Sequence, residues 1–110
     1  MKKTVLTFAT LLLAGSLPMT AMAADPAEGI AQKSGCLACH AKDKKLVGPA
    51  FKDVAGKYKG DAGAPDKLAE KVRKGGSGVW GPIPMSPNPA DKINDADLKA
   101  VVAWILKGAA

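Results

Sequence analysis

Residues 36–40 read Cys-Leu-Ala-Cys-His, and this pentapeptide decides how the rest of the chain is interpreted. The pattern Cys-x-x-Cys-His is the attachment site of a c-type haem. Two thiols at this spacing can each add to one vinyl group of the porphyrin, and the adjacent imidazole can then bind the iron. We therefore predict that Cys36 and Cys39 form thioether bonds and that His40 is an axial ligand.

Three other uses of this motif have weaker support in the sequence. A disulfide between Cys36 and Cys39 would close a short, strained loop and would leave His40 without a role. A thioredoxin-like redox pair needs a strand-helix-strand setting, and no strand pattern flanks the motif. A zinc site needs further ligands, but the chain has no other cysteine or histidine. Haem attachment is therefore the favoured interpretation.

Residues 1–23 have the pattern of a secretory signal peptide. Two lysines precede an apolar run over residues 5–14, and Ala21-Met22-Ala23 places small side chains at both positions that the peptidase reads. A signal anchor is the alternative, but the run is shorter than the roughly 20 residues that a membrane span needs. We predict export with cleavage after Ala23, which leaves one monohaem domain over residues 24–110.

The composition limits the partners and the core. Loss of the two lysines of the leader lowers the formal net charge from +6 to +4. The remaining lysines are spread along the chain without interleaved aromatic residues, which disfavours nucleic acid and suits an acidic protein partner. Ile, Leu, Val and Phe make up only about 18% of residues 24–110, which is marginal for an independent core. A buried haem would supply the missing apolar surface.

Helix caps, apolar spacing and glycine stops predict four helices and no strands. The last helix has the clearest pattern, because Leu98, Val101, Val102 and Ile105 follow the spacing i, i+3, i+4, i+7. The predicted helices run from Asp25 as N-cap to Gly35, from Pro49 to Gly56, from Asp66 to Lys74, and from Asn94 as N-cap to about Gly108.

The second axial ligand follows by elimination. Of the four methionines, only Met85 remains after the leader is removed, and it follows a loop rich in glycine and proline. Core packing is the alternative role for Met85, but a rigid loop is a poor place for a flexible filler. A lysine amine or an open position are the other possibilities at the iron. We predict Met85 as the ligand.

The segment that follows the motif offers two further candidates. A proximal imidazole needs an acceptor at its second nitrogen, and the rigid turn at Pro49 could supply a backbone carbonyl. Lys42, Lys44 and Lys45 form either a solvated loop or part of a docking surface. Val47, Ile83 and Pro84 flank the two ligand loops and are candidates for an apolar rim around the haem edge.

Together these motifs resemble the small class I cytochromes c of Gram-negative bacteria, the cytochrome c-551 (c8) type. The resemblance is carried by the Asp25-Pro26 helix start, residues 36–40, Val47-Gly48-Pro49-Ala50, residues 75–85 and the last helix with Trp104. It implies an all-α, single-domain fold of four to five short helices wrapped around one covalent haem c with its iron. In this family pattern, the carbonyl of Pro49 holds His40, and the indole of Trp80 donates a hydrogen bond to a haem propionate.

The resemblance also implies a function. The protein would be a soluble periplasmic one-electron carrier in anaerobic or aerobic respiration, and not an enzyme. Its redox partners would be a donor such as a cytochrome bc1-type complex and an acceptor such as nitrite reductase or a terminal oxidase. We expect a monomer with no nucleic acid partner and no membrane insertion.

Two other functions stay open at this stage. One is a peroxidase or a nitric oxide binder with a displaced sixth ligand; a peroxidase would need a distal histidine or arginine, and the sequence offers only Arg73. A domain that acts only within a larger complex is the other possibility.

Overall fold

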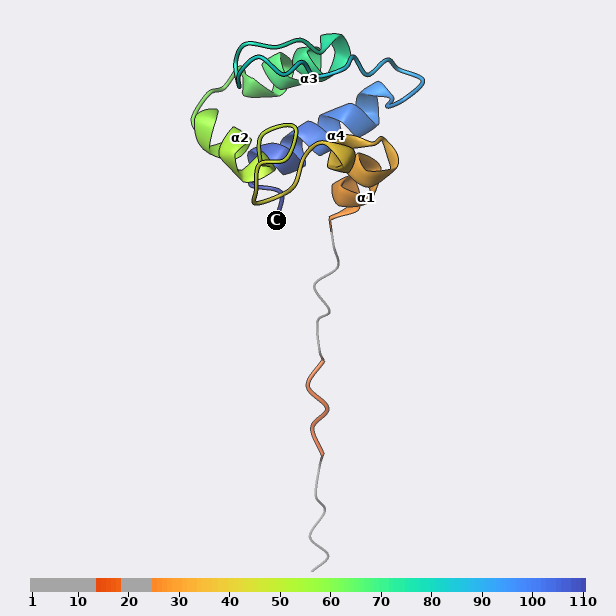
Figure 1. Cartoon of the computed structure of the whole chain (residues 1–110). Coiled ribbons are helices and arrows are strands. Elements are labelled where there is room, and N and C mark those ends of the chain that lie inside the picture. Colours follow the sequence, from red (N-terminus) through yellow and green to blue (C-terminus); the bar gives the residue numbers. More distant parts are fainter. Residues whose placement is uncertain (1–13, 19–24) are drawn as a thin grey trace, which may run out of the picture.

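The structure is a computed structural model that describes residues 14–18 and 25–110. Within these residues the chain forms four α-helices, one short 3-10 helix and no strands, so the predicted helical fold is confirmed. The elements are α1 (Pro26–Lys33), η1 (Cys36–Ala38), α2 (Phe51–Lys57), α3 (Ala64–Lys74) and α4 (Asp95–Leu106), as Figure 1 shows. No helix of the described residues is both long and apolar enough to cross a membrane. Most of the predicted leader, with the cleavage site after Ala23, lies outside the described residues.

The first and last helices begin where their caps predict. The carboxylate of Asp25 accepts a hydrogen bond from the N–H of Ala27 at 3.0 Å. The side-chain carbonyl of Asn94 accepts one from the N–H of Asp97 at 2.8 Å. Each bond satisfies a backbone donor that has no partner within its own helix. Capping therefore fixes the starting points of α1 and α4.

The predicted bounds of the two middle helices need correction. Gly56 does not stop α2, which begins at Phe51 and continues to Lys57. A glycine inside a helix costs only about 1 kcal/mol relative to alanine, and tertiary packing can outweigh that cost. Helix α3 begins before the predicted residue, at Ala64. The side chain of Asp61 accepts hydrogen bonds from the N–H of Gly63 and from Lys67, both at 2.8 Å, and thereby stabilises this earlier start.

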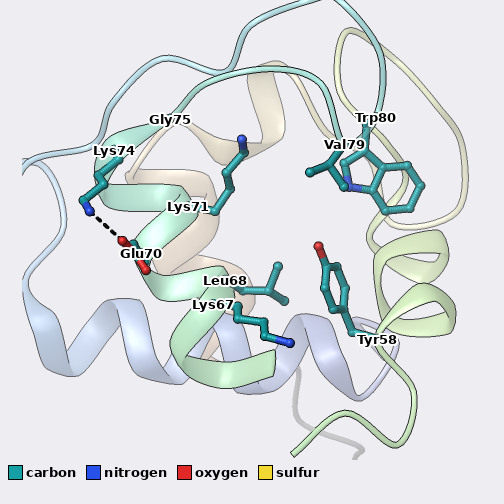
Figure 2. A pocket seen from close by; sticks show the side chains of 9 residues that line it. All are labelled: Tyr58, Lys67, Leu68, Glu70, Lys71, Lys74, Gly75, Val79 and Trp80. Carbon is teal, nitrogen blue, oxygen red and sulfur yellow. Dashed lines mark hydrogen bonds and ion pairs between the residues drawn. The ribbon is translucent and has the colours of Figure 1, made fainter. Parts of the chain in front are cut away.

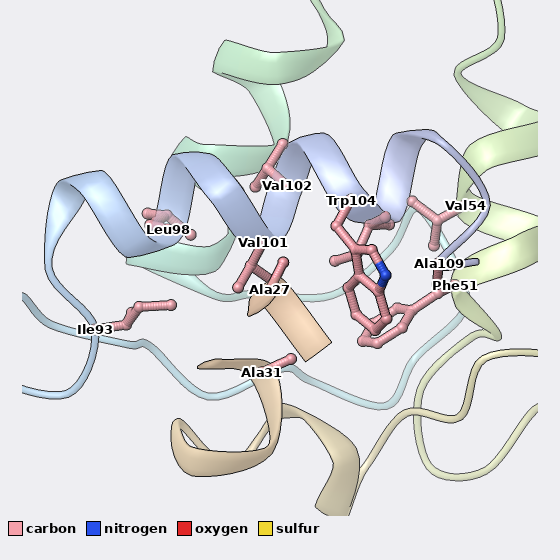
Figure 3. Packing of buried hydrophobic residues seen from close by; sticks show 11 residues of the cluster. Ala27, Ala31, Phe51, Val54, Ile93, Leu98, Val101, Val102, Trp104 and Ala109 are labelled. Atoms are coloured by element: carbon pink, nitrogen blue, oxygen red, sulfur yellow. The ribbon is translucent and has the colours of Figure 1, made fainter. Parts of the chain in front are cut away.

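Helix α4 is the centre of the core and packs against α1, α2 and α3 (Figure 1). The predicted stripe is buried, with Leu98, Val101, Val102 and Ile105 between 2% and 8% exposed. The small side chains of Ala27 and Ala31 on α1 also belong to the cluster of buried residues (Figure 3). Trp104 meets the ring of Phe51 edge-on, with centroids 5.6 Å apart. These contacts order the helices, and the candidate ligands lie outside them on loops.

Candidate haem site

The imidazole of His40 is held through one nitrogen. Its Nδ1 lies 2.8 Å from the carbonyl oxygen of Pro49, so the proton on Nδ1 is donated and Nε2 keeps its lone pair. The loop returns to the motif through a 2.8 Å hydrogen bond from the N–H of Gly48 to the carbonyl of Cys39. The carbonyl of Pro49 is the acceptor predicted for the imidazole of His40, and the 2.8 Å contact joins these two groups. The free Nε2 is the atom available to a metal.

Two neighbours restrict the ring of His40. Phe51 stacks on it with centroids 5.1 Å apart and an interplanar angle of 22°. A Cβ added at Gly48 would lie 2.7 Å from Nδ1 of His40, closer than real Cβ atoms approach other groups. Position 48 therefore needs glycine because the backbone passes directly beside the imidazole. The motif and the loop after it form one rigid unit.

The two thiols lie on the short turn η1, directly before the imidazole. Cys36 is partly buried, Cys39 is exposed, and the two are not joined to each other. The carbonyl of Cys36 accepts hydrogen bonds from the N–H groups of Cys39 at 3.2 Å and His40 at 3.0 Å, which keeps the three residues compact. Burial raises the pKa of the Cys36 thiol, and the nearby Lys92 ammonium partly offsets this rise.

Met85 is fixed through its backbone to the end of α3. Its N–H and carbonyl exchange two hydrogen bonds of 2.9 Å with Gly76. Gly75 adopts a φ of +66°, and a Cβ there would lie 2.9 Å from the nitrogen of Pro87 and closer still to the carbonyl of Met85. Glycine is therefore required where the two segments pair. The sequence predicted an irregular loop here but not this pairing.

A cavity of about 380 Å³ opens between α3 and the loop that carries Trp80 (Figure 2). Trp80 is 40% exposed, and the ammonium of Lys57 lies 5.4 Å from its ring centroid. The residues that line the cavity are Tyr58, Lys67, Leu68, Glu70, Lys71, Lys74, Gly75, Val79 and Trp80. Lys71 is one of the lining residues that the sequence did not single out. Its only signal is its position three residues after Leu68, at the edge of the apolar face of α3.

The exposed apolar side chains test whether a haem fits these residues. Among the described residues, every exposed large hydrophobic side chain except Leu17 lies on one of two loops, the one after His40 or the one before Met85. They are Leu46, Val47, Val79, Trp80 and Ile83, at 40% to 59% exposure. Exposed apolar groups gathered in this way mark a binding surface. With the free Nε2 of His40, they fit a flat apolar group that carries a metal.

Comparison with known proteins agrees with this geometry. The sequence model of the family "Cytochrome c" matches residues 24–109. Cytochrome c2 of Rubrivivax gelatinosus is 54% identical over 84 residues, which are 76% of this chain and 98% of the relative. Cytochrome c-551 of Pseudomonas aeruginosa is 44% identical over 97 residues, 88% of this chain and 90% of the relative.

A solved structure extends the similarity to the fold. The crystal structure of wild-type cytochrome c552 from Nitrosomonas europaea superposes with a TM-score of 0.69 at 48% identity. The match covers 74% of this chain and 98% of that one. The chain therefore belongs to the cytochrome c family as a small class I member of the c-551 type, an electron carrier with one covalently bound haem c and its iron.

Proposed function

We propose that the chain is a periplasmic one-electron carrier with its haem attached through Cys36 and Cys39 and its iron held between His40 and Met85. The observation that supports this most directly is the 2.8 Å bond between Nδ1 of His40 and the carbonyl of Pro49. This bond selects the tautomer in which Nε2 is free to bind a metal.

The bound haem would supply the one-electron couple, and the chain would tune and shield it. His40 and Met85 would together hold the iron, which would leave it no position for a substrate. The apolar side chains of Val47, Val79 and Ile83 would exclude water from the macrocycle. Electron transfer through the haem edge is the chemistry that remains.

Trp80 and Lys71 are the proposed partners of a haem propionate. The indole N–H of Trp80 is a donor, the ammonium of Lys71 is a cation, and the two residues line the same cavity (Figure 2). A hydrogen bond from a charged donor to a carboxylate is about twice as strong as a neutral one. Lys71 would therefore add to the propionate contact that the family resemblance implies for Trp80.

The location and the partners follow from charge and from the leader. We propose that residues 1–23 direct export to the periplasm and are removed there. The exposed Lys42, Lys44 and Lys45 would steer an acidic partner toward the haem edge. The donor would be a protein such as a cytochrome bc1-type complex, and the acceptor one such as nitrite reductase or a terminal oxidase. The carrier would act as a monomer, because a shuttle needs a small and transient interface.

An enzymatic role finds less support in the surroundings of Arg73, the only arginine in the chain. Its guanidinium donates hydrogen bonds to the carbonyls of Asn88 and Ile93 and pairs with the carboxylate of Asp95. A peroxidase would need a distal arginine free to contact a bound peroxide. Arg73 is committed to other partners.

The test is the substitution Met85→Ala in the holoprotein. The ferrous wild type should bind carbon monoxide only slowly, whereas the variant should bind it readily and should have a lower reduction potential, because a thioether ligand favours ferrous iron. Absorption spectra with and without carbon monoxide, together with a potentiometric titration, measure both effects.

Ser86→Ala is the matched control, since this neighbour is exposed and lies in the same loop. It should leave the spectrum unchanged. Equal carbon monoxide binding by the wild type and by Met85→Ala would show that Met85 is not the ligand.

A further inference from the structure

Arg73 joins three segments of the chain at the end of α3. Its Nη1 donates to the carbonyl oxygens of Asn88 at 3.0 Å and Ile93 at 2.6 Å, and its Nη2 donates to the carboxylate of Asp95 at 2.5 Å. These acceptors lie 15 to 22 residues away in sequence. A guanidinium can bind them together because its donors point in fixed, different directions. Arg73 therefore ties α3 to the whole segment between Met85 and α4.

The same segment is attached to α3 a second time, through Asn88. Its backbone N–H and its side-chain amide donate to the carbonyl of Val72 at 3.0 Å and 3.2 Å, and the amide also donates to the carbonyl of Ser86 at 3.0 Å. Asn88 is 8% exposed, so these groups have little access to water. Residues 86–88 are thus held directly beyond the two hydrogen bonds between Met85 and Gly76.

We propose that Arg73 is a positioning residue for Met85. A movement of the C-terminal side of the Met85 loop away from α3 would carry Met85 off the iron, and this movement must break the hydrogen bonds of Arg73 to the carbonyls of Asn88 and Ile93. The inference rests on the proposed function, in which Met85 is an axial ligand. It goes beyond that function because it assigns control of the iron bond to a residue that does not itself bind the iron.

The carbonyl bonds matter more than the ion pair. The side chain of Asp95 is 94% exposed, whereas that of Arg73 is 23% exposed. An ion pair with one partner in water adds little, but a partly buried carbonyl that loses a charged donor keeps its full desolvation cost. Removal of the Asp95 carboxylate should therefore leave the bonds from Arg73 to the two carbonyls in place, whereas removal of the Arg73 guanidinium should break them.

The experiment measures imidazole binding to the ferric holoprotein, because exogenous imidazole can reach the iron only after Met85 has left. In Arg73→Gln we expect binding at least about tenfold faster than in the wild type, which corresponds to about 1.4 kcal/mol. Arg73→Lys should give an intermediate rate, since an ammonium can reach one carbonyl but not all three acceptors. Asp95→Asn should stay within about twofold of the wild type.

Lys74→Gln is the matched control, because it removes the same charge from the same helix end. Lys74 is exposed and pairs with Glu70 on its own helix. A rate in Arg73→Gln within about twofold of the wild type would overturn the proposal, and so would an equal increase in Lys74→Gln.

Two further measurements separate positioning from general stability and from the choice of ligand. The first is the free energy of unfolding, measured on the same samples by urea titration and circular dichroism. In Arg73→Gln it should fall by less than the free energy that corresponds to the change in the imidazole-binding rate. Equal changes in both would mean that Arg73 only stabilises the fold, and would overturn the proposal. The second is the absorption band between methionine and ferric iron in the wild type. If this band is absent, Met85 is not the ligand and the proposed function fails as well. If the band is present and the rate in Arg73→Gln is unchanged, only the role of Arg73 is overturned.

Discussion

The helical core and the two ligand loops order apolar side chains in different ways. Around α4, Val101, Val102 and Trp104 are only 1% to 2% exposed and pack against the other helices. On the loops beside His40 and Met85, side chains such as Val47 and Ile83 are 52% and 59% exposed. In the first region the helices bury these side chains against one another, whereas the second region needs a further apolar surface to cover it. At the proposed site the haem would therefore complete the core of the protein.

The largest expected effect comes from removal of the attachment points. The double variant Cys36→Ala with Cys39→Ala should be largely unfolded or degraded after export, because few apolar residues remain to form a core without the cofactor. Thermal unfolding followed by circular dichroism is the measurement. A cooperative transition in this haem-free variant would show that the helices alone suffice and that the haem is not needed to complete the core.

A smaller effect should separate the two regions within the holoprotein. Trp104→Ala should lower the free energy of unfolding by about 3–5 kcal/mol, because it empties a buried site. Val47→Ala should cost about 1 kcal/mol or less, since the polypeptide itself leaves this side chain half exposed and the change removes only two methyl groups beside the haem. Chemical denaturation of both variants with haem attached gives the two values.

Trp104→Phe is a useful control for this pair. The indole N–H of Trp104 is buried and has no acceptor among the described residues. Phenylalanine also keeps an aromatic ring against Phe51. The variant should fall between the other two, at about 1–2 kcal/mol. If Val47→Ala costs as much as Trp104→Ala, the loops belong to the core in the same sense as α4.

The smallest effect concerns the loop surface and leaves stability aside. Lys44→Glu with Lys45→Glu should slow electron transfer to an acidic partner about three- to tenfold at low salt, and the effect should fade as ionic strength rises. Ile83→Lys should slow transfer at any salt, because the apolar rim sets the final contact. Stopped-flow rates across a salt series distinguish the two.

Lys99→Glu with Lys107→Glu makes the same change in net charge on exposed positions of the last helix and its cap. This control should have little influence on the rate. Docking lies elsewhere if neither loop variant affects transfer to the physiological partner.

Local chemistry made most of the fold predictable from sequence. The side chains of Asp25 and Asn94 mark the starts of α1 and α4 because a cap acts within three residues. The stripe on α4 is buried as its spacing predicts. The end of α2 was predicted wrongly because tertiary packing decides whether Gly56 interrupts a helix.

The candidate site divides along the same line. The haem motif, His40 and the turn at Pro49 lie within 14 residues, where spacing has a direct chemical meaning. The contacts of Arg73, and the presence of Lys71 and Trp80 at one cavity, depend on side chains from segments that are distant in sequence. Sequence periodicity does not predict contacts between distant segments, so the roles of these residues can be inferred only from the folded structure.

The fixed position of the His40 imidazole also affects how fast the proposed carrier can transfer electrons. Electron transfer is slowed when atoms must move between the oxidised and the reduced state. The imidazole is fixed by the carbonyl of Pro49, by the ring of Phe51 and by the backbone at Gly48, independently of the charge on a bound metal. A ligand that keeps one position in both states adds little to the reorganisation energy. Gly48 would thus help to keep electron transfer fast, because a larger side chain at this position would displace the imidazole of His40.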